Sequence, residues 1–381
     1  MRMLLFTPTF LPIIGGAERM ADVLVRGLRS RDHDVRVLAQ RSRLGEADLP
    51  YPVYRYRRPP LMHLWPEVVG RSLRRVHRDW PFDVVLAFYA HPTGYAAGRL
   101  KRTLGFRLVV STRGGDLYPM CHLHRKRRGL SVIRQGYRSA DVIVSLSRWM
   151  TRRLAEVVGD DLPPVEVIPN GIDLGEHQRQ LDTAARTTPG SAVAEAIAGD
   201  GPRVLHLATL TPVKRHAVAI EAIAAARATF EGAGGRYVIA GDGPCRAELE
   251  ARVDAAGVRH LVHFVGFAKG LDKYALLNRA TMMVSTSMAE GMPNALLEAM
   301  ASGVPGLVSD IDPHVELTEA APWARTFALD DAADLARGFE AMFDSDLAPM
   351  RQAARQQATR YTLERLIDRY EAVCLGEHSA I

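Results

Sequence analysis

The sequence predicts an α/β fold with two doubly wound parallel sheets, one in each half of the 381-residue chain. Short runs of apolar, mostly β-branched residues alternate with helix-length segments along the whole chain, which is typical of parallel strands buried on both faces. The length is sufficient for two ordinary domains. An apolar content of 47% and a charged content of 24% indicate a soluble globular protein.

Six apolar runs in each half are predicted as strands. They cover residues 3–6, 35–39, 83–88, 107–111, 141–146 and 165–168 in the first half, and 203–208, 237–241, 262–266, 282–286, 304–309 and 324–329 in the second. Residues 183–202 are small, polar and rich in Gly and Pro, which indicates a linker with room for one helix. We therefore expect an N-terminal domain over 1–175, a C-terminal domain over 176–355, and a helix within 356–381 that packs back on the first domain.

The composition also bears on location and partners. No apolar run reaches the roughly 18 residues of a membrane-spanning helix, and Pro8 and Pro12 interrupt the apolar start, so we expect a buried first strand rather than a signal peptide. Three scattered cysteines favour a reducing cytoplasm.

Residues 1–175 carry 29 Lys+Arg against 16 Asp+Glu, a net charge of +13, and residues 176–381 carry 20 against 27, a net of −7. The basic first half indicates anionic partners.

The polar, Gly-rich loops of the chain follow predicted strands. In open parallel sheets, ligands bind beyond the carboxyl ends of the strands. Such loops are found at 15–18 and 112–116 in the first half, and at 209–216, 241–244, 266–267 and 288–294 in the second. We expect them to line one cleft between the two domains.

The segment "EGMPNALLEAM" places a carboxylate on either side of a predicted helix start, Glu290 before it and Glu298 one turn inside. The first backbone N–H groups of a helix have no partner within the helix and attract anions, so the amides of residues 292–295 could take a diphosphate. Glu298 could then accept ribose hydroxyls and Glu290 a sugar hydroxyl. By spacing alone, the segment favours the simpler interpretation, a capped amphipathic helix with Leu297, Met300 and Ala301 in the core.

Five segments, in this order along the chain, resemble glycosyltransferase family 4. They are "GGAERMADVLVRGL" (15–28), "VIPNGID" (167–173), "HLATLTPVKRH" (206–216), "IAGDGPCRAELE" (239–250) and "STSMAEGMPNALLEAMASGVP" (285–305), the last with the Glu-x7-Glu pair. The match covers nearly the whole chain. It implies the GT-B fold, in which two Rossmann-like domains face each other across a cleft, and a retaining, metal-independent transfer of a sugar from a nucleoside diphosphate, with uridine the usual base.

The resemblance also implies roles for individual residues. Glu290 would hold the transferred sugar at its 3-hydroxyl, and Lys214 would neutralise the leaving diphosphate; these two are the expected catalytic residues. Glu298 would bind the donor ribose. The other expected donor-binding residues are Gly15, Gly16, Thr209, Arg215, Gly243, Met292, Pro293, Asn294 and Ala295. The expected acceptor-side residues are Glu18, His91, Arg113 and Asp116. No metal and no cofactor besides the donor are expected.

Two positions depart from the family pattern. The family usually has an arginine five residues before the lysine, where this chain has Thr209, and we expect Arg215, Arg113 or backbone donors to compensate. The family often has a histidine in the loop after the fourth strand, where this chain has Arg113.

Other motifs leave alternatives open. The Asp-x-Asp pairs at 310–312 and 32–34 could suggest a metal-dependent transferase, and "CHLH" (121–124) a metal site, but we interpret all three as loop or helix-entry residues. Arginines recur through 55–80 and 124–128 and could contact anionic lipid. The simpler interpretation of 55–80 is a helix packed on its own sheet with solvated arginines.

The resulting hypothesis is a cytoplasmic glycosyltransferase that visits the membrane. The basic first half favours an anionic acceptor, lipid-linked or an acidic glycan of a cell-surface polysaccharide; the alternative is a soluble small-molecule or natural-product acceptor. A nucleotide-sugar epimerase or dehydrogenase would need Gly-x-Gly-x-x-Gly after the first strand, which "FTPTFLPIIGGAE" lacks. A basic nucleic-acid-binding protein is a distant alternative, without the expected signatures.

Overall fold

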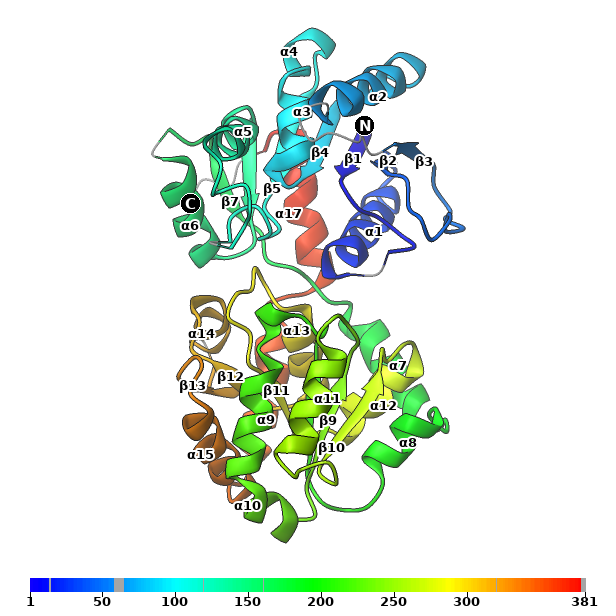
Figure 1. Cartoon of the computed structure of the whole chain (residues 1–381). Helices are drawn as coiled ribbons and strands as arrows, with labels where there is room; N and C mark the ends of the chain where they lie inside the picture. The colour runs from blue at the N-terminus through cyan, green and yellow to red at the C-terminus, as the bar shows by residue number, and fades with distance from the viewer. Residues whose placement is uncertain (14, 58–64, 119, 160, 320, 378–381) are drawn as a thin grey trace. The chain divides into compact units, whose positions relative to one another are not determined.

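The computed structural model describes residues 1–381 except 14, 58–64, 119, 160, 320 and 378–381. The chain forms two compact units (Figure 1). Unit 1 consists of Met1–Asn170 and Glu364–Ile381, and unit 2 of Gly171–Leu363. Each unit is described by itself below. Among the described residues, no helix combines the length and the apolar character needed to cross a membrane.

Unit 1 contains a seven-stranded, wholly parallel sheet in the order β3-β2-β1-β4-β5-β6-β7. The strands are β1 (Arg2–Thr7), β2 (Asp34–Gln40), β3 (Val53–Tyr56), β4 (Val84–Phe88), β5 (Arg107–Ser111), β6 (Val142–Ser145) and β7 (Val165–Val167). The helices are α1 (Gly16–Arg29), α2 (Trp65–Asp79), α3 (Tyr95–Gly98), α4 (Lys101–Leu104), α5 (Arg127–Arg138), α6 (Arg148–Val158) and, for all but its first residue, α17 (Leu363–Leu375).

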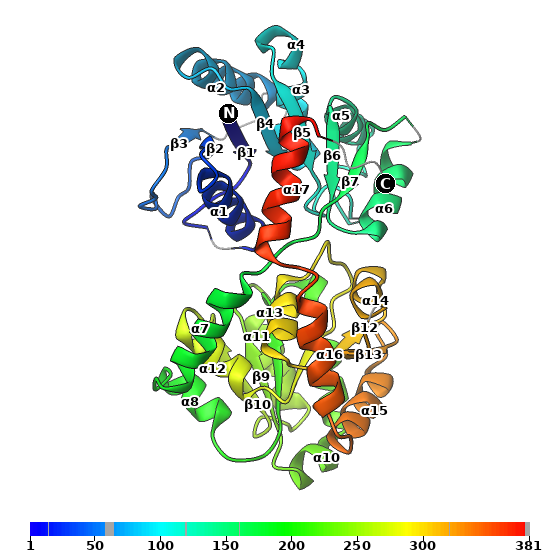
Figure 2. The ribbon, with the colours of Figure 1, turned by 180° about the vertical axis from the view of Figure 1, so that it is seen from behind.

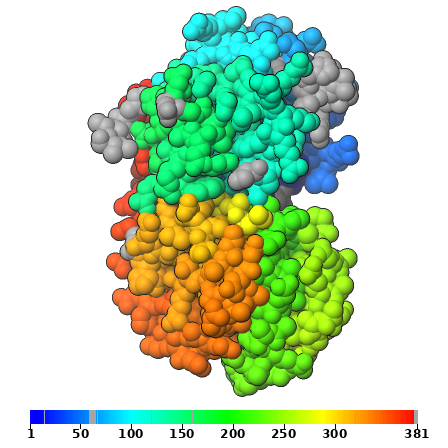
Figure 3. Space-filling view, turned by 60° about the vertical axis from the view of Figure 1, so that its left-hand side comes forward, coloured from blue at the N-terminus to red at the C-terminus, as the bar shows by residue number. Residues whose placement is uncertain are grey.

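Unit 2 contains a six-stranded parallel sheet in the order β10-β9-β8-β11-β12-β13. The strands are β8 (Arg203–Leu207), β9 (Arg236–Ala240), β10 (Val262–Gly266), β11 (Met282–Ser285), β12 (Gly306–Ser309) and β13 (Ala324–Phe327). The helices are α7 (Leu174–Ala185), α8 (Ser191–Ile197), α9 (His216–Ala225), α10 (Arg227–Gly232), α11 (Arg246–Ala255), α12 (Leu271–Arg279), α13 (Asn294–Ser302), α14 (Asp312–Thr318), α15 (Ala332–Phe343) and α16 (Ala348–Ala358). Residues of α14 and α15, coloured orange, reach the surface in Figure 3.

The predicted fold class is confirmed, since every predicted strand overlaps an observed one. Strand β3 was not predicted; it is short, mostly half-buried and pairs with β2 alone at the edge of the sheet. Residues 183–202 were predicted as a linker with room for one helix. They contain the end of α7 and one whole helix, α8, but they lie within unit 2 and do not connect the two units. The main chain passes between the units at Asn170–Gly171 and returns at Leu363–Glu364.

The C-terminal helix α17 packs into unit 1, as predicted, and Figure 2 shows it against the sheet beside α1. Arg31, just after α1, forms ion pairs with Asp368 and Glu371 of α17. A Cβ on Gly27 of α1 would lie 1.9 Å from a side-chain carbon of Ile367, so only glycine lets the two helices approach this closely.

Helix α2 packs on its own sheet, which confirms the simpler interpretation for the part of 55–80 that is described. Val69, Leu73 and Val76 are buried in the core of unit 1. The arginines of α2 lie on its outer face, where the side chains of Arg75 and Arg78 are 79% and 75% exposed. Trp65 is half-buried and stacks on the ring of His91. The described part of α2 therefore presents charge to solvent rather than an apolar stripe.

The motifs that suggested a metal site occupy ordinary structural positions. Asp310 accepts a hydrogen bond from the Leu329 amide at 2.8 Å, and Asp312 begins α14. Asp34 pairs with Arg36 and accepts from the indole of Trp80. In the part of the chain that the structure describes, no three His, Cys, Asp or Glu side chains gather so that they could hold a metal ion.

Candidate active site

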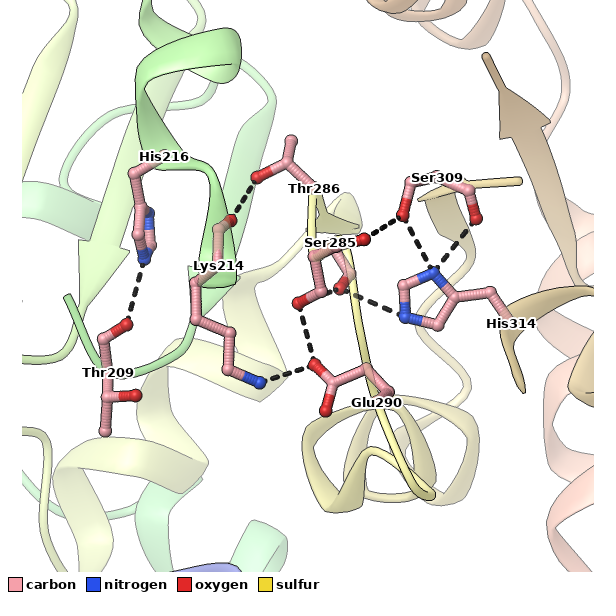
Figure 4. Close-up of polar contacts among 9 residues, drawn as sticks. Thr209, Lys214, His216, Ser285, Thr286, Glu290, Ser309 and His314 are labelled. Atoms are coloured by element: carbon pink, nitrogen blue, oxygen red, sulfur yellow. Dashed lines mark hydrogen bonds and ion pairs between the residues drawn. The ribbon is translucent and has the colours of Figure 1, made fainter. Parts of the chain in front are cut away.

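Two loops of unit 2 meet at the carboxyl ends of neighbouring strands, β8 and β11 (Figure 4). The first loop contains a single 3-10 turn, Pro212–Lys214, directly before α9. Thr286 Oγ1 donates to the carbonyl of Lys214 at 2.7 Å, and the amide of Met288 donates to the carbonyl of Val213 at 2.9 Å. These two bonds fix the backbone of the first loop against that of the second, so side chains from both converge on one place.

Lys214 and Glu290 form an ion pair at this place, with Lys214 Nζ donating to Glu290 Oε1 (Figure 4). Ser287 Oγ donates to the same oxygen at 2.7 Å, and Glu290 is 8% exposed. Burial alone would raise the pKa of Glu290, but the Lys214 ammonium and the Ser287 hydroxyl outweigh it and hold the pKa below its usual value. Both hydrogen bonds that Glu290 accepts from described residues end on Oε1, so Oε2 is the oxygen placed to accept from a ligand.

Helix α13 begins next to this pair. Pro293, predicted in the first helical turn, lies one residue earlier, at the N-cap, and Asn294 is the first helical residue. Met292 is buried, while Asn294 and Ala295 are half-buried. Because the positive end of the helix dipole lies at these residues, their surroundings favour an anion.

Glu298 lies one turn inside α13. Its Oε1 accepts a hydrogen bond from Lys273 Nζ of α12 at 2.6 Å, and the two side chains are 19% and 10% exposed. The α13 segment thus has an ion pair before its first turn, Lys214–Glu290, and a second one inside the helix, Lys273–Glu298.

The Gly-x-Gly-Pro turn after β9 packs against the backbone at the start of the Lys214 loop. A Cβ on Gly241 would lie 1.8 Å from the carbonyl oxygen of Ala208, and one on Gly243 would lie 2.5 Å from that of Leu210. The carbonyl of Asp242 accepts from the Leu210 amide at 3.0 Å. Positions 241 and 243 therefore require glycine, because a side chain there would meet the backbone of residues 208–210. Gly243 contributes to the site by allowing this packing, which positions the Lys214 loop.

Thr209 and Arg215 flank Lys214 at the two ends of the same loop. Thr209 is exposed, and its carbonyl lies 3.4 Å from His216 Nε2. Arg215 has φ 53°, in the left-handed region, and its guanidinium pairs with Asp330 at 2.6 Å. The Arg215 side chain is 38% exposed, so a role as a second phosphate-binding cation stays a prediction.

Three of the predicted residues of unit 1 follow β1. Gly15 is the N-cap of α1 and Gly16 its first residue, and Glu18 lies in the first turn. Thr9 Oγ1 donates to Glu18 Oε1. A Cβ on Gly15 would lie 2.3 Å from the other carboxylate oxygen of Glu18, so the glycine keeps the start of α1 open for this side chain.

Arg113 and Asp116 follow β5 and are buried inside unit 1. The Arg113 guanidinium donates to Asn170 Oδ1 and to the hydroxyl of Tyr370, each at 3.0 Å, and lies over the ring of Phe88. Asp116 accepts from the Ala90 amide at 2.6 Å and from the Tyr137 hydroxyl at 2.9 Å. Both side chains hold neighbouring segments of unit 1 together, and their predicted acceptor-side role stays a prediction.

His91 lies directly after Tyr89 and Ala90 at the end of β4. Burial, with His122 nearby, lowers the pKa of His91 to about 4, so the ring is neutral at physiological pH. Tyr89 has φ 71°, which is unusual for a bulky residue, and its phenol interacts electrostatically with Glu18, Arg113 and Asp116. Tyr89 was not predictable as part of this region, because backbone strain is not visible in a residue's identity.

Comparison with known proteins decides what kind of site this is. The family model of Glycosyltransferase Family 4 matches residues 14–176, and that of Glycosyl transferases group 1 matches residues 191–361. The chain belongs to glycosyltransferase family 4. It is therefore a glycosyltransferase, and the resemblance of its motifs is confirmed.

Three known proteins are similar in sequence to this glycosyltransferase. The putative glycosyltransferase EpsF of Bacillus subtilis is 32% identical over 38% of this chain and 36% of its own length. The putative colanic acid biosynthesis glycosyltransferase WcaL of Escherichia coli is 27% identical over 75% of this chain and 68% of its own. The 2-deoxystreptamine glucosyltransferase of Streptomyces kanamyceticus is 25% identical over 61% of this chain and 60% of its own length. The match thus spans little more than a third of EpsF and less than two thirds of the Streptomyces enzyme.

Solved structures share the fold of this glycosyltransferase over nearly its whole length. Sucrose-phosphate synthase from Thermosynechococcus elongatus has a TM-score of 0.80 at 17% identity, with 98% of each chain covered. Anabaena HepE in complex with UDP-glucose has a TM-score of 0.75 at 19% identity, with 98% and 99% covered. These likenesses establish the GT-B fold.

Three residues at this site were not predicted from the sequence of the glycosyltransferase. Lys273 lies on the same face of α12 as buried Leu276 and Leu277, and a lysine on an apolar face is a signal for a buried ion pair. His314 had no comparable signal, since it contacts Ser285 from a separate helix, and Ser287 was not singled out although it donates to Glu290 only three residues away.

Proposed function

We propose that this enzyme transfers a sugar from a nucleoside diphosphate sugar to a hydroxyl group, with retained configuration and without a metal ion. The observation that carries the proposal is the Lys214–Glu290 pair directly before the start of α13, with Glu298 one turn inside the helix. A cation and a helix start suit a diphosphate, and a carboxylate on each side suits the hydroxyls of a sugar and of a ribose.

In this reaction the bond between the sugar C1 and the diphosphate oxygen breaks, and a bond from C1 to the acceptor oxygen forms on the same face. Negative charge grows on the departing diphosphate, where the ammonium of Lys214 and the start of α13 stabilise it. The acceptor proton passes to the departing phosphate. Glu290, ionised because of its partners, orients the sugar through Oε2, and Glu298 positions the ribose.

A uridine nucleotide is the proposed donor. The support is by analogy: HepE, which shares the fold, has been crystallised with UDP, with UDP and glucose, and with UDP-glucose. The proposal of uridine rests on this likeness and on the family.

Product analysis tests this function. Purified enzyme in EDTA is incubated with a panel of UDP-, GDP- and ADP-sugars and a mixture of acceptors, and products are identified by mass spectrometry. We expect one donor to be consumed, with release of its nucleoside diphosphate and gain of one hexose mass on an acceptor. Activity that EDTA abolishes and Mg²⁺ or Mn²⁺ restores would overturn metal independence, and consumption of no nucleotide sugar would overturn the function.

An anionic acceptor, lipid-linked or an acidic glycan, is the proposed partner of unit 1. Residues 1–175 carry a net charge of +13, from 29 Lys+Arg and 16 Asp+Glu, and the arginines of α2 are solvated. Each basic residue near an anionic membrane contributes about 1 kcal/mol, so a few suffice for peripheral binding. The relative WcaL is described as a putative colanic acid biosynthesis glycosyltransferase, which agrees with an acidic glycan as acceptor. The 2-deoxystreptamine glucosyltransferase instead favours a soluble acceptor.

Vesicle co-sedimentation tests the membrane proposal. We expect binding to phosphatidylglycerol-rich vesicles at low salt, and loss of binding with neutral vesicles or at high salt. Changing Arg71, Arg74, Arg75 and Arg78 to Gln should abolish it. The matched control removes the same charge from unit 2, at Arg227, Arg252, Arg259 and Arg337, and should leave binding intact. Equal loss in both variants, or binding that ignores lipid charge, would favour a soluble acceptor.

A further inference from the structure

His314 is a fully buried side chain of α14, between the ends of β11 and β12 (Figure 4). Its Nδ1 lies 3.0 Å from the carbonyl oxygen of Ser309 and 3.1 Å from Ser309 Oγ. Its Nε2 lies 3.3 Å from Ser285 Oγ. The imidazole therefore contacts the last residue of each of two neighbouring strands.

The tautomer of His314 follows from these partners. A carbonyl oxygen can only accept, and Ser309 Oγ donates its own proton to the carbonyl of Ser287 at 2.6 Å. Nδ1 must therefore carry a hydrogen, and Nε2 accepts from the hydroxyl of Ser285. Burial lowers the pKa of His314 to about 4 although the Glu290 carboxylate opposes this, so the ring is neutral and Lys214 is the charged partner of Glu290.

The contacts of His314 continue to Glu290. Ser309, held by Nδ1, bonds the backbone of Ser287. The Ser285 hydroxyl, whose one hydrogen goes to Nε2, lies 3.4 Å from the Ser287 hydroxyl without donating to it, and Ser287 Oγ donates to Glu290 Oε1 at 2.7 Å. The segment 285–287 is thus fixed on one side by the imidazole, and on its other side it holds the carboxylate.

We propose that His314 is a positioning residue for sugar transfer. Through Ser309, Ser285 and Ser287, it holds the Glu290 carboxylate so that Oε1 faces Lys214 and Oε2 faces the sugar. This inference rests on the proposed role of Glu290. Misplacing a reacting group by about 1 Å can cost on the order of 10²-fold in rate, so the loss of such a support lowers kcat even when the fold survives.

The test compares His314→Leu with His314→Asn, whose side-chain amide can still donate where Nδ1 does. We expect His314→Leu to lower kcat by about 10- to 10²-fold with donor KM changed by less than about threefold, and His314→Asn to recover part of the loss. His263→Leu, a change of a half-buried histidine on β10, is the matched control and should leave kcat unchanged. Equal losses in His314→Leu and His263→Leu, or no recovery in His314→Asn, would contradict the proposal.

A double-mutant cycle separates positioning from general damage. In a Glu290→Gln background, His314→Leu should cost less than about threefold further, since both changes disable the same group. A further loss as large as in the wild type would overturn the proposal while leaving the role of Glu290 intact. No effect of Glu290→Gln alone would instead overturn the proposed function.

Ser285→Ala covers the case in which His314→Leu does not fold. It removes only the hydroxyl that donates to Nε2, and thermal denaturation should show a folded protein. We expect a several-fold fall in kcat that disappears in the Glu290→Gln background. An unchanged kcat in Ser285→Ala would contradict the link from His314 to Glu290 through this serine.

Discussion

Lys214→Ala is expected to lower kcat of sugar transfer by about 10²–10³-fold, the cost of removing one preorganised donor from a developing oxyanion. The ammonium of Lys214 is fixed by Glu290 and by a loop whose carbonyl accepts from Thr286 at 2.7 Å, so it costs little reorganisation during the reaction. The substitution also leaves Glu290, 8% exposed, without its cation, and its pKa should rise.

Initial rates at saturating donor measure this effect, with Lys269→Ala as the matched control, because Lys269 is exposed in the same unit. Lys269→Ala should keep wild-type kcat. Lys214→Arg should recover only part of the activity, since the guanidinium is larger and planar. A loss of less than about threefold in Lys214→Ala would show that the α13 start alone stabilises the leaving diphosphate.

Glu298→Ala is expected to weaken donor binding by about 10- to 10²-fold, because hydrogen bonds to a charged group contribute about 1.5–3 kcal/mol. The ribose interacts alike in the ground state and the transition state, so donor KM should rise strongly while kcat changes little. Glu290→Gln should instead lower kcat strongly and change donor KM little, since Glu290 holds the sugar that reacts. Glu298→Ala also leaves Lys273 buried without its carboxylate and could lower stability. Glu298→Gln can still accept a hydrogen bond from Lys273, so it is the second variant in which donor binding is compared.

Most strands were predictable because they are apolar runs, and several, such as β4, β6 and β11, are buried along their whole length. The failures have physical causes. β3 lies at a sheet edge and alternates Val, Tyr and Arg, so it has no continuous apolar run. Residues 183–202 have the small and polar composition of a linker, but buried Ala184, Val193 and Ala196 pack α7 and α8 within unit 2. Helices with few apolar contacts are poorly marked by periodicity.

The candidate site was predictable where its chemistry is local in sequence. Glu290, Glu298 and the helix start lie in one segment, and Lys214 follows its strand in a recognisable loop. Lys273 and His314 were missed because they act on that segment from other helices. Arg113 was predicted from its loop position alone, and its hydrogen bond to Tyr370 depends on α17, more than 200 residues away.

Calorimetric titration of UDP into the enzyme in EDTA tests most directly whether the diphosphate donor binds at α13. Wild-type enzyme should bind UDP at one site without metal, Glu298→Ala should bind about 10-fold or more weakly, and Glu221→Ala, which changes an exposed glutamate of the same unit, should match the wild type. Equal affinities of Glu298→Ala and wild type, or no binding of any nucleoside diphosphate to the wild type, would contradict this placement of the donor.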